Sequence, residues 1–308
     1  MNAKHLIAIP IIICVTTMCV YSTLLLFNEK DRTFPLSHQH PAIVKGIDFL
    51  KTQVDDDGCI TSVSVTAWVA MALASSGENL SAWGTTKQYL IDTVDLLNES
   101  LATDWERHCL ALVAFGVDPT NVSGIDVVER IKGFYAHGQI GLENNSYDDC
   151  FGILALRSCG VPKNDEIINS TMNVIQGEQQ PDGGWGDVDT TAVAILALTA
   201  YEPLETTSHI QQAIDFIQSK QTEEGGFFSW GCTNTASTSW VLCSLSSLQE
   251  NPFLETWKKN NHNPVDFLLE LQQTDGSFLY SENTSMNPEW MTAYALIALT
   301  GGTLVTGP

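Results

Sequence analysis

The stretch TAWVAMAL, residues 66–73, decides the fold because related phrases recur five more times along the chain. The other copies are WERHCLAL (105–112), DCFGILAL (149–156), TAVAILAL (191–198), TSWVLCSL (238–245) and TAYALIAL (292–299). The copies are apolar on nearly every side, which is typical of buried helices. Spacings of about 40 to 50 residues predict an array of one helical unit that no single copy can stabilise alone.

Amphipathic segments, with apolar residues at helical spacing, lie between the buried phrases. They cover residues 43–52, 86–97, 122–135, 166–179, 210–220 and 265–271. Alternation of buried and amphipathic helices predicts an all-α fold, an (α/α)6 barrel of six helix pairs in which an outer ring wraps an inner ring. Close packing of the inner helices is expected at the small residue before each final Leu: Ala72, Ala111, Ala155, Ala197, Ser244 and Ala298.

Three turns after outer helices share a Gln before a glycine and an aromatic residue after it. They read QQPDGGW (179–185), QTEEGGF (221–227) and QQTDGSF (272–278). Glycine stops the helix, the amide ties down free backbone groups, and the aromatic ring covers the helix end. With these turns, residues 40–300 resemble the repeat of squalene and terpenoid cyclases and of protein prenyltransferase β subunits. GWGDVDTTA (184–192) looks most like microbial barrel proteins related to cobalamin carriers.

Charge and length limit the partners and the domain count. The 308 residues include 14 basic and 36 acidic side chains, a formal net charge of −22. This charge repels phosphate backbones, so we expect no nucleic acid partner. Six helix pairs use nearly the whole chain, which leaves no room for a second domain.

The N-terminal segment Leu6–Phe27 carries no charged residue. As a helix it reaches ~33 Å, enough for a hydrocarbon core of ~30 Å. We therefore expect a signal anchor or transmembrane helix over residues 1–27, a tether over 28–40, the barrel over 41–300 and a tail over 301–308. Lys4 and the α-amino group favour a cytoplasmic N-terminus, which places the barrel on the extracytoplasmic side of a single-pass membrane protein. The alternative is a cleaved signal peptide and a secreted barrel.

Six of the eight cysteines lie beyond this segment: Cys59, Cys109, Cys150, Cys159, Cys232 and Cys243. In an oxidising compartment they allow disulfides. The alternative is that those in the buried phrases act as small hydrophobic residues.

The phrase DVDTTA (187–192) contains the candidate catalytic residues Asp187 and Asp189. Squalene–hopene cyclases have Asp-x-Asp-Asp-Thr-Ala at the corresponding place, and the resemblance implies that Asp189 is the acid that protonates an alkene, with Asp187 behind it. Thr190 replaces the third acid of that motif. Such an acid must be held neutral in an apolar pocket. The alternative, which we favour from the sequence, is that Asp189 caps the buried helix that follows.

The resemblance to prenyltransferases implies a zinc site, and Asp148-Asp149-Cys150 is similar to the Asp-x-Cys of that family. No His follows in the matching part of the last inner helix, which reads Trp290-Met291-Thr292-Ala293-Tyr294. We therefore expect no metal site, and an acidic helix start before a buried Cys instead.

Aromatic and polar residues gather at one end of the ring if all inner helices run in the same sense. Aromatic faces with a few convergent polar groups suit a flat or elongated organic ligand. The predicted ligand-binding residues are Trp68, Trp105, Arg107, Asp148, Phe151, Trp230, Trp240, Trp290 and Tyr294. The alternative for any one of these aromatics is that it fills the space between the rings.

The sequence thus favours a membrane-anchored barrel that binds a small hydrophobic or flat ligand without transforming it. The resemblance suggests a corrinoid or an isoprenoid, with no certain cofactor. One alternative is an isoprenoid cyclase-like or prenyltransferase-like enzyme that uses Asp189. A second is a non-catalytic surface domain that presents its acidic face to another protein.

Overall fold

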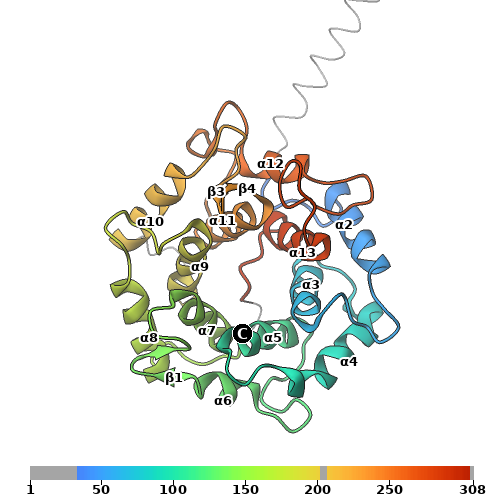
Figure 1. Ribbon diagram of the computed structural model, residues 1–308, viewed down its shortest axis with the longest axis vertical. Coiled ribbons are helices and arrows are strands. Elements are labelled where there is room, and N and C mark those ends of the chain that lie inside the picture. The colour runs from blue at the N-terminus through green and yellow to red at the C-terminus, as the bar shows by residue number, and fades with distance from the viewer. Residues whose placement is uncertain (1–32, 202–206, 306–308) are drawn as a thin grey trace, which may run out of the picture. The chain divides into compact units, whose positions relative to one another are not determined.

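A computed structural model describes residues 33–201 and 207–305. The chain divides into residues 1–34 and 35–308, and the helices named here belong to the second unit. Each inner helix contacts the next, and the last contacts the first, so the inner ring is closed (Figure 1). The inner helices are α3 (Val63–Ser75), α5 (Ala102–Ala114), α7 (Ser146–Ser158), α9 (Val188–Thr199), α11 (Thr235–Ser247) and α13 (Pro288–Leu299).

The outer helices alternate with the inner ones along the chain and lie outside them in Figure 1. They are α2 (Pro41–Thr52), α4 (Gly84–Asp92), α6 (Val127–Lys132), α8 (Glu166–Gly177), α10 (Ser208–Ser219) and α12 (Pro264–Glu270). Short 3-10 helices, η1 (Leu80–Trp83), η2 (Val94–Leu96) and η3 (Glu255–Trp257), extend three of the connections. The predicted α/α barrel is confirmed.

Close packing at the small residues of the inner ring is also confirmed. All six of them are 0% exposed, so an added side chain at these positions has no free space. The outer helix predicted over 122–135 is much shorter than expected. Ser123 and Gly124 adopt positive φ values of 50° and 85°, which form a tight turn and delay the helix start to Val127.

Each predicted glutamine ties its own turn to the following outer helix or its approach. Gln179 Nε2 donates to the carbonyl oxygens of Gly183 and His209, both at 2.8 Å, and His209 lies in α10. Gln272 Nε2 donates in the same way to the Ala42 carbonyl in α2, at 2.8 Å. The last repeat is therefore bonded to the first outer helix, which helps to close the ring.

Two β-hairpins, which the sequence did not predict, precede α7 and α11. The first pairs β1 (Tyr135–Ala136) with β2 (Gln139–Ile140), and the second pairs β3 (Phe228–Ser229) with β4 (Cys232–Thr233), both antiparallel. The central turn residues have positive φ values, as two-residue hairpin turns require. In the second hairpin they are Trp230 at 55° and Gly231 at 91°.

The ends of the barrel unit pack against it more closely than the predicted tether and tail imply. Leu36 N donates to the Leu299 carbonyl at 2.8 Å, and Leu304 is only 4% exposed. The membrane span predicted over Leu6–Phe27 lies outside the described residues. Within residues 33–201 and 207–305, no helix is long and apolar enough to cross a bilayer.

Candidate active site

Two layers of side chains line the end of the ring at which the inner helices begin. The upper layer holds the residues two positions before each buried phrase: Ser64, Thr103, Tyr147, Asp189, Ala236 and Trp290. The lower layer holds the third residue of each phrase: Trp68, Arg107, Phe151, Val193, Trp240 and Tyr294. Residues four apart share a helix face, so each upper residue lies above a lower one.

Aromatic rings of the lower layer fill the centre of the ring. The Trp68 ring lies edge-on to those of Trp240 and Tyr294, with centroids 5.5 and 4.9 Å apart. Phe151 packs edge-on against Trp68 at 5.9 Å and is 2% exposed. Phe151, predicted to bind ligand, therefore belongs to the packed floor, because its neighbours cover it.

Above this floor lies a cavity with two lobes. The acid lobe, about 640 Å³, is lined by Asp189, Trp230, Trp240 and Met291 among others. The arginine lobe, about 420 Å³, is lined by Trp68, Arg107 and Asp148 among others. The lobes share the lining residues Asn145, Tyr147, Trp290 and Tyr294, so they adjoin. The cavity brings together seven of the predicted ligand-binding residues, whose role in binding stays a prediction: Trp68, Arg107, Asp148, Trp230, Trp240, Trp290 and Tyr294.

The cap of α9 is Asp187, which corrects the prediction that Asp189 caps this helix. Asp187 has an extended backbone, and its Oδ1 accepts a hydrogen bond from Thr190 N at 2.8 Å. Asp189 is the second residue inside the helix and lines the acid lobe. The Asp189 carboxyl group is therefore not used as the helix cap and is available for catalysis.

The Asp189 carboxyl group has one oxygen in a well-formed hydrogen bond and one buried oxygen without such a bond. Trp230 Nε1 donates to Oδ2 at 3.1 Å. Oδ1 is shielded from water and accepts no well-formed hydrogen bond among the described residues. Burial raises the pKa of Asp189 to about 6 and is the largest effect. Hydrogen bonds from the Ser237 hydroxyl and the Trp230 N–H lower this pKa, and the negative charge of Asp187 raises it. A carboxyl group with this pKa is protonated in a substantial fraction of molecules near neutral pH.

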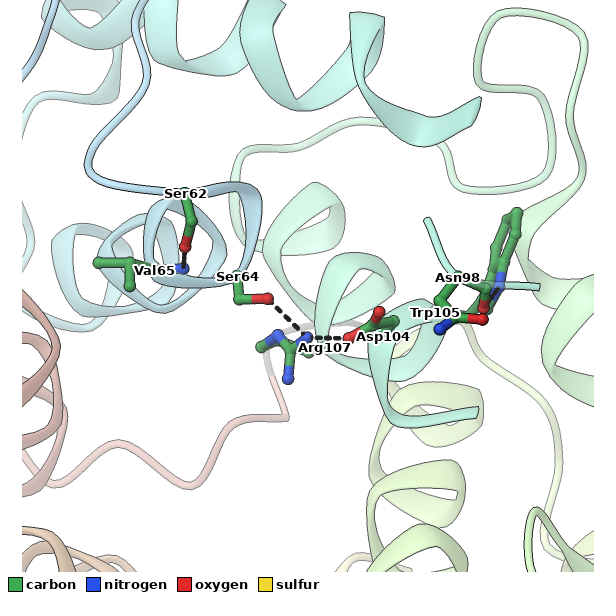
Figure 2. A network of polar contacts seen from close by, with 7 residues as sticks. All are labelled: Ser62, Ser64, Val65, Asn98, Asp104, Trp105 and Arg107. Carbon is green, nitrogen blue, oxygen red and sulfur yellow. Dashed lines mark hydrogen bonds and ion pairs between the residues drawn. The ribbon is translucent and has the colours of Figure 1, made fainter. Parts of the chain in front are cut away.

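The arginine lobe has a basic group that is already paired. Arg107 Nη2 donates to Ser64 Oγ at 2.9 Å and to the carboxylate of Asp104, one turn earlier in α5 (Figure 2). Asp148 Oδ2 accepts from Leu142 N at 2.9 Å. This lobe therefore combines positive and negative groups that largely balance.

Trp105 lines neither lobe, so the structure does not bring it together with the other predicted ligand-binding residues. Its Nε1 donates to the Asn98 carbonyl at 3.1 Å, and the Arg130 guanidinium lies 5.5 Å from its ring centroid. Figure 2 shows Trp105 and Arg107 on different sides of α5. Trp105 occupies the first position of its phrase. In the fourth copy this position is Thr191, whose Oγ1 accepts a hydrogen bond from Trp185 N in the preceding turn at 2.9 Å.

The segment Asp148-Asp149-Cys150, which is similar to the Asp-x-Cys of prenyltransferases, has a structural role. Asp149 Oδ1 accepts from Ile140 N at 2.8 Å, which is the bond that Thr191 makes in its own repeat. The Cys150 thiol is fully buried, and burial raises its pKa well above the usual range. In the described ranges, no three His, Cys, Asp or Glu side chains are grouped so as to hold a metal ion.

Tyr147 and Asn145 line both lobes, and the sequence did not single them out. Tyr147 was detectable, because it stands two positions before its buried phrase, like Asp189 and Trp290. No pattern marked Asn145, which lies just before α7.

The family model of the prenyltransferase alpha-alpha toroid domain matches residues 61–230, more than half of the chain. The chain belongs to this family. The model of the squalene-hopene cyclase C-terminal domain matches residues 187–302, and that match begins at Asp187. The toroid repeat therefore extends through the part of the chain that carries the acid lobe.

Solved structures share the toroid fold. Type II terpene cyclase MstE from Scytonema is 16% identical with a TM-score of 0.63, over 86% of this chain and 98% of that chain. ent-Copalyl diphosphate synthase from Streptomyces platensis is 18% identical with a TM-score of 0.58, over 78% of this chain. The match spans half of that synthase's length.

An alpha-1,6-mannanase of Salegentibacter is 12% identical with a TM-score of 0.62, over 86% of this chain and 98% of that chain. Terpene cyclases and a mannanase share this fold, so the activity has to be argued from the site.

Proposed function

We propose that this protein is a proton-initiated terpene cyclase in which Asp189 donates a proton to an isoprenoid alkene. The observation that carries the proposal is the position of Asp189, which is free of the capping role and lines an aromatic cavity. An alkene is a weak base, so its protonation needs a neutral carboxylic acid in a site with little water. Partial burial of Asp189 supplies this condition.

The hydrogen bond from Trp230 decides which oxygen carries the proton. The indole N–H can only donate, so Oδ2 must act as the acceptor. The acidic proton then resides on Oδ1, the oxygen without a well-formed partner among the described residues. Oδ1 is shielded from water, so a rotation of the carboxyl group, whose terminal torsion is soft, brings this proton to the lobe where an alkene can take it.

The reaction follows from this geometry. The π electrons of the terminal alkene take the proton from the Asp189 carboxyl group, which leaves Asp189 ionised and a positive charge on the neighbouring carbon. The next alkene closes a ring on that carbon, which moves the positive charge along the chain. A proton then passes from the last cation to a water molecule, and solvent reprotonates Asp189. Aromatic faces stabilise such positive charge, and Trp240, Trp290 and Tyr294 line the acid lobe.

The comparisons support this reading more than non-catalytic binding, for which they give no support. Variants of MstE have been solved with geranylgeranyl dihydroxybenzoate as substrate and with merosterolic acid A as product. A corrinoid ligand, the membrane anchor and an extracytoplasmic barrel stay predictions.

The test is product formation by the full-length protein in detergent. Wild type, Asp189→Asn and Asp165→Asn are incubated with squalene and with shorter polyprenyl substrates, and the extracts are analysed by mass spectrometry. Asp165 caps the outer helix α8, and Asn keeps that cap, so Asp165→Asn is the matched control. We expect cyclised product from wild type and control but not from Asp189→Asn. No product from folded wild type with any of these substrates would contradict the proposal.

A further inference from the structure

The two lobes differ in the chemistry that they offer to one elongated molecule. Aromatic and aliphatic side chains dominate the acid lobe, whereas the arginine lobe adds Arg107, Asp148 and Thr103. Tyr147 and Trp290 line both lobes, so a chain that reaches Asp189 can extend into the arginine lobe. The arginine lobe is therefore placed to receive the polar end of a substrate.

The charges around the cavity disfavour an anionic end. Arg107 is the one basic side chain among the described residues that line the two lobes, and Asp104 already pairs with it. Asp148 and Asp187 line the same cavity, and Asp189 adds a further negative charge whenever it is ionised. Phosphate groups bind where Arg, Lys or a metal ion offsets their charge, and here acids outnumber the base. The net charge of −22 adds to the repulsion at long range.

Arg107 still has donors for an uncharged oxygen. A guanidinium group carries five N–H donors, and the bonds to Ser64 and Asp104 both use Nη2. Among the described residues, the N–H groups on Nε and Nη1 make no hydrogen bond. Its partners fix the guanidinium in place, so a hydroxyl or carbonyl oxygen meets a donor that is already oriented.

We propose that the arginine lobe holds an uncharged oxygen-bearing head group, so that the substrate is a neutral isoprenoid such as a prenyl alcohol and not a prenyl diphosphate. This inference rests on the proposed function and deepens it by naming the substrate class. Like charges brought together in a binding site cost several kcal/mol. A diphosphate therefore binds at least about 100-fold more weakly than the alcohol of the same chain length.

Binding is measured on the full-length protein in detergent, through quenching of tryptophan fluorescence. The Asp189→Asn variant serves as the background, so that no substrate is consumed. The probes are geranylgeraniol, geranylgeranyl diphosphate with and without Mg²⁺, and a hydrocarbon of the same length without a head group. We expect geranylgeraniol to bind tightest. Diphosphate binding as tight as that of the alcohol, or no binding of the alcohol, overturns the inference.

Variants of the arginine lobe identify the group that is responsible. Arg107→Gln should weaken alcohol binding about 10-fold or more and leave hydrocarbon binding unchanged, because a hydrogen bond to a charged group is lost. Asp104→Asn frees the charge of Arg107 and should tighten diphosphate binding. The matched control is Arg130→Gln, an arginine on α6 that lies outside both lobes. Equal weakening of alcohol and hydrocarbon by Arg107→Gln would overturn the inference.

The two proposals fail separately. Squalene cyclisation by wild type without binding of the alcohol overturns the head-group inference and leaves the cyclase proposal standing. Selective binding of the alcohol without any cyclised product overturns the cyclase proposal and supports the neutral-ligand site.

Discussion

Trp230 Nε1 lies 3.1 Å from Asp189 Oδ2, although 41 positions separate the two residues in the sequence. The bond joins the β3–β4 hairpin, which precedes α11, to the first turn of α9. Trp230 is 70% exposed and has a φ of 55°, an uncommon conformation for a residue other than glycine. The hairpin turn requires a positive φ at this position, where Asn, Asp or Gly is usual, and the Trp found there holds one oxygen of the acid.

Replacement of Trp230 by Phe tests this bond. The variant keeps an aromatic ring but loses the N–H, which lowers the pKa of Asp189 in the wild type. We expect the pKa of Asp189 to rise and turnover to fall, since the carboxyl group is then no longer held in position. A shift of the pH–rate profile toward higher pH is the measurement. Phe228→Leu, at an exposed position of the same hairpin, is the control and should leave the profile in place.

Turnover by wild type should depend on pH through Asp189. The active form is the neutral acid, and its pKa is about 6. The rate should therefore be highest below pH 6 and fall about tenfold per unit well above it. Initial rates between pH 5 and pH 8, with protein folding checked at each pH, measure this dependence. A rate that rises with pH across this range would show that the ionised carboxylate is the working form.

Asp187 and Asp189 should affect stability differently. Asp187→Ala removes the cap of α9 and should cost about 0.5 to 2 kcal/mol, whereas Asp187→Asn keeps the cap. Urea unfolding of both variants measures the difference. A loss at Asp189→Ala as large as that at Asp187→Ala would return the capping role to Asp189.

The pH dependence of stability gives a second comparison. The folded-state pKa of Asp189 is raised above its unfolded value, so its contribution is complete below pH 3.8 and is lost as the pH rises through about 6. Asn stays neutral at every pH. Asp189→Asn should therefore gain stability relative to wild type at pH 7.5 and not at pH 4. Thermal unfolding at both pH values measures this, and an unchanged difference would contradict a raised pKa.

Among the described cysteines, one pair has its two sulfur atoms close enough for a disulfide to form. The six described cysteines are free thiols, and the sulfur atoms of Cys109 and Cys159 lie 3.1 Å apart. Oxidised glutathione should join them, because it takes up the two electrons and two protons that the thiols lose. Mass spectrometry of alkylated peptides should then show Cys109 and Cys159 protected and the buried Cys243 reduced. Continued alkylation of Cys109 in the unfolded, oxidised protein would show that no bond forms.

The inner ring was predictable because its helices repeat one apolar phrase with one small residue at a fixed place. Helix boundaries were not, and this produced the error at Asp189: the cap falls on Asp187 because α9 starts at Val188, two residues earlier than the capping prediction required. Trp105 lies outside the cavity for another reason. The first residue of each phrase points toward the preceding turn and away from the cavity. The hydrogen bond of the aligned Thr191 shows this orientation, which the sequence alone does not.

The cavity itself was predictable in outline. The third residue of each phrase pointed to Trp240 and Tyr294, which line it. Ala236, in the layer above, carried no signal because a small side chain contributes empty space and no chemistry. Trp230 was singled out by its residue type, but the hairpin that brings it to Asp189 depends on two residues with positive φ that no helical pattern indicates.

The most direct test of proton donation by Asp189 is the isotope content of the product formed in D₂O. The carboxyl proton exchanges with solvent, so each cyclised product molecule from wild type should carry one deuterium at the carbon that Asp189 protonates. Asp189→Asn should give no cyclised product, since an amide cannot supply the proton. Cyclised product from wild type without deuterium, or the same deuterated product from Asp189→Asn, would contradict the account.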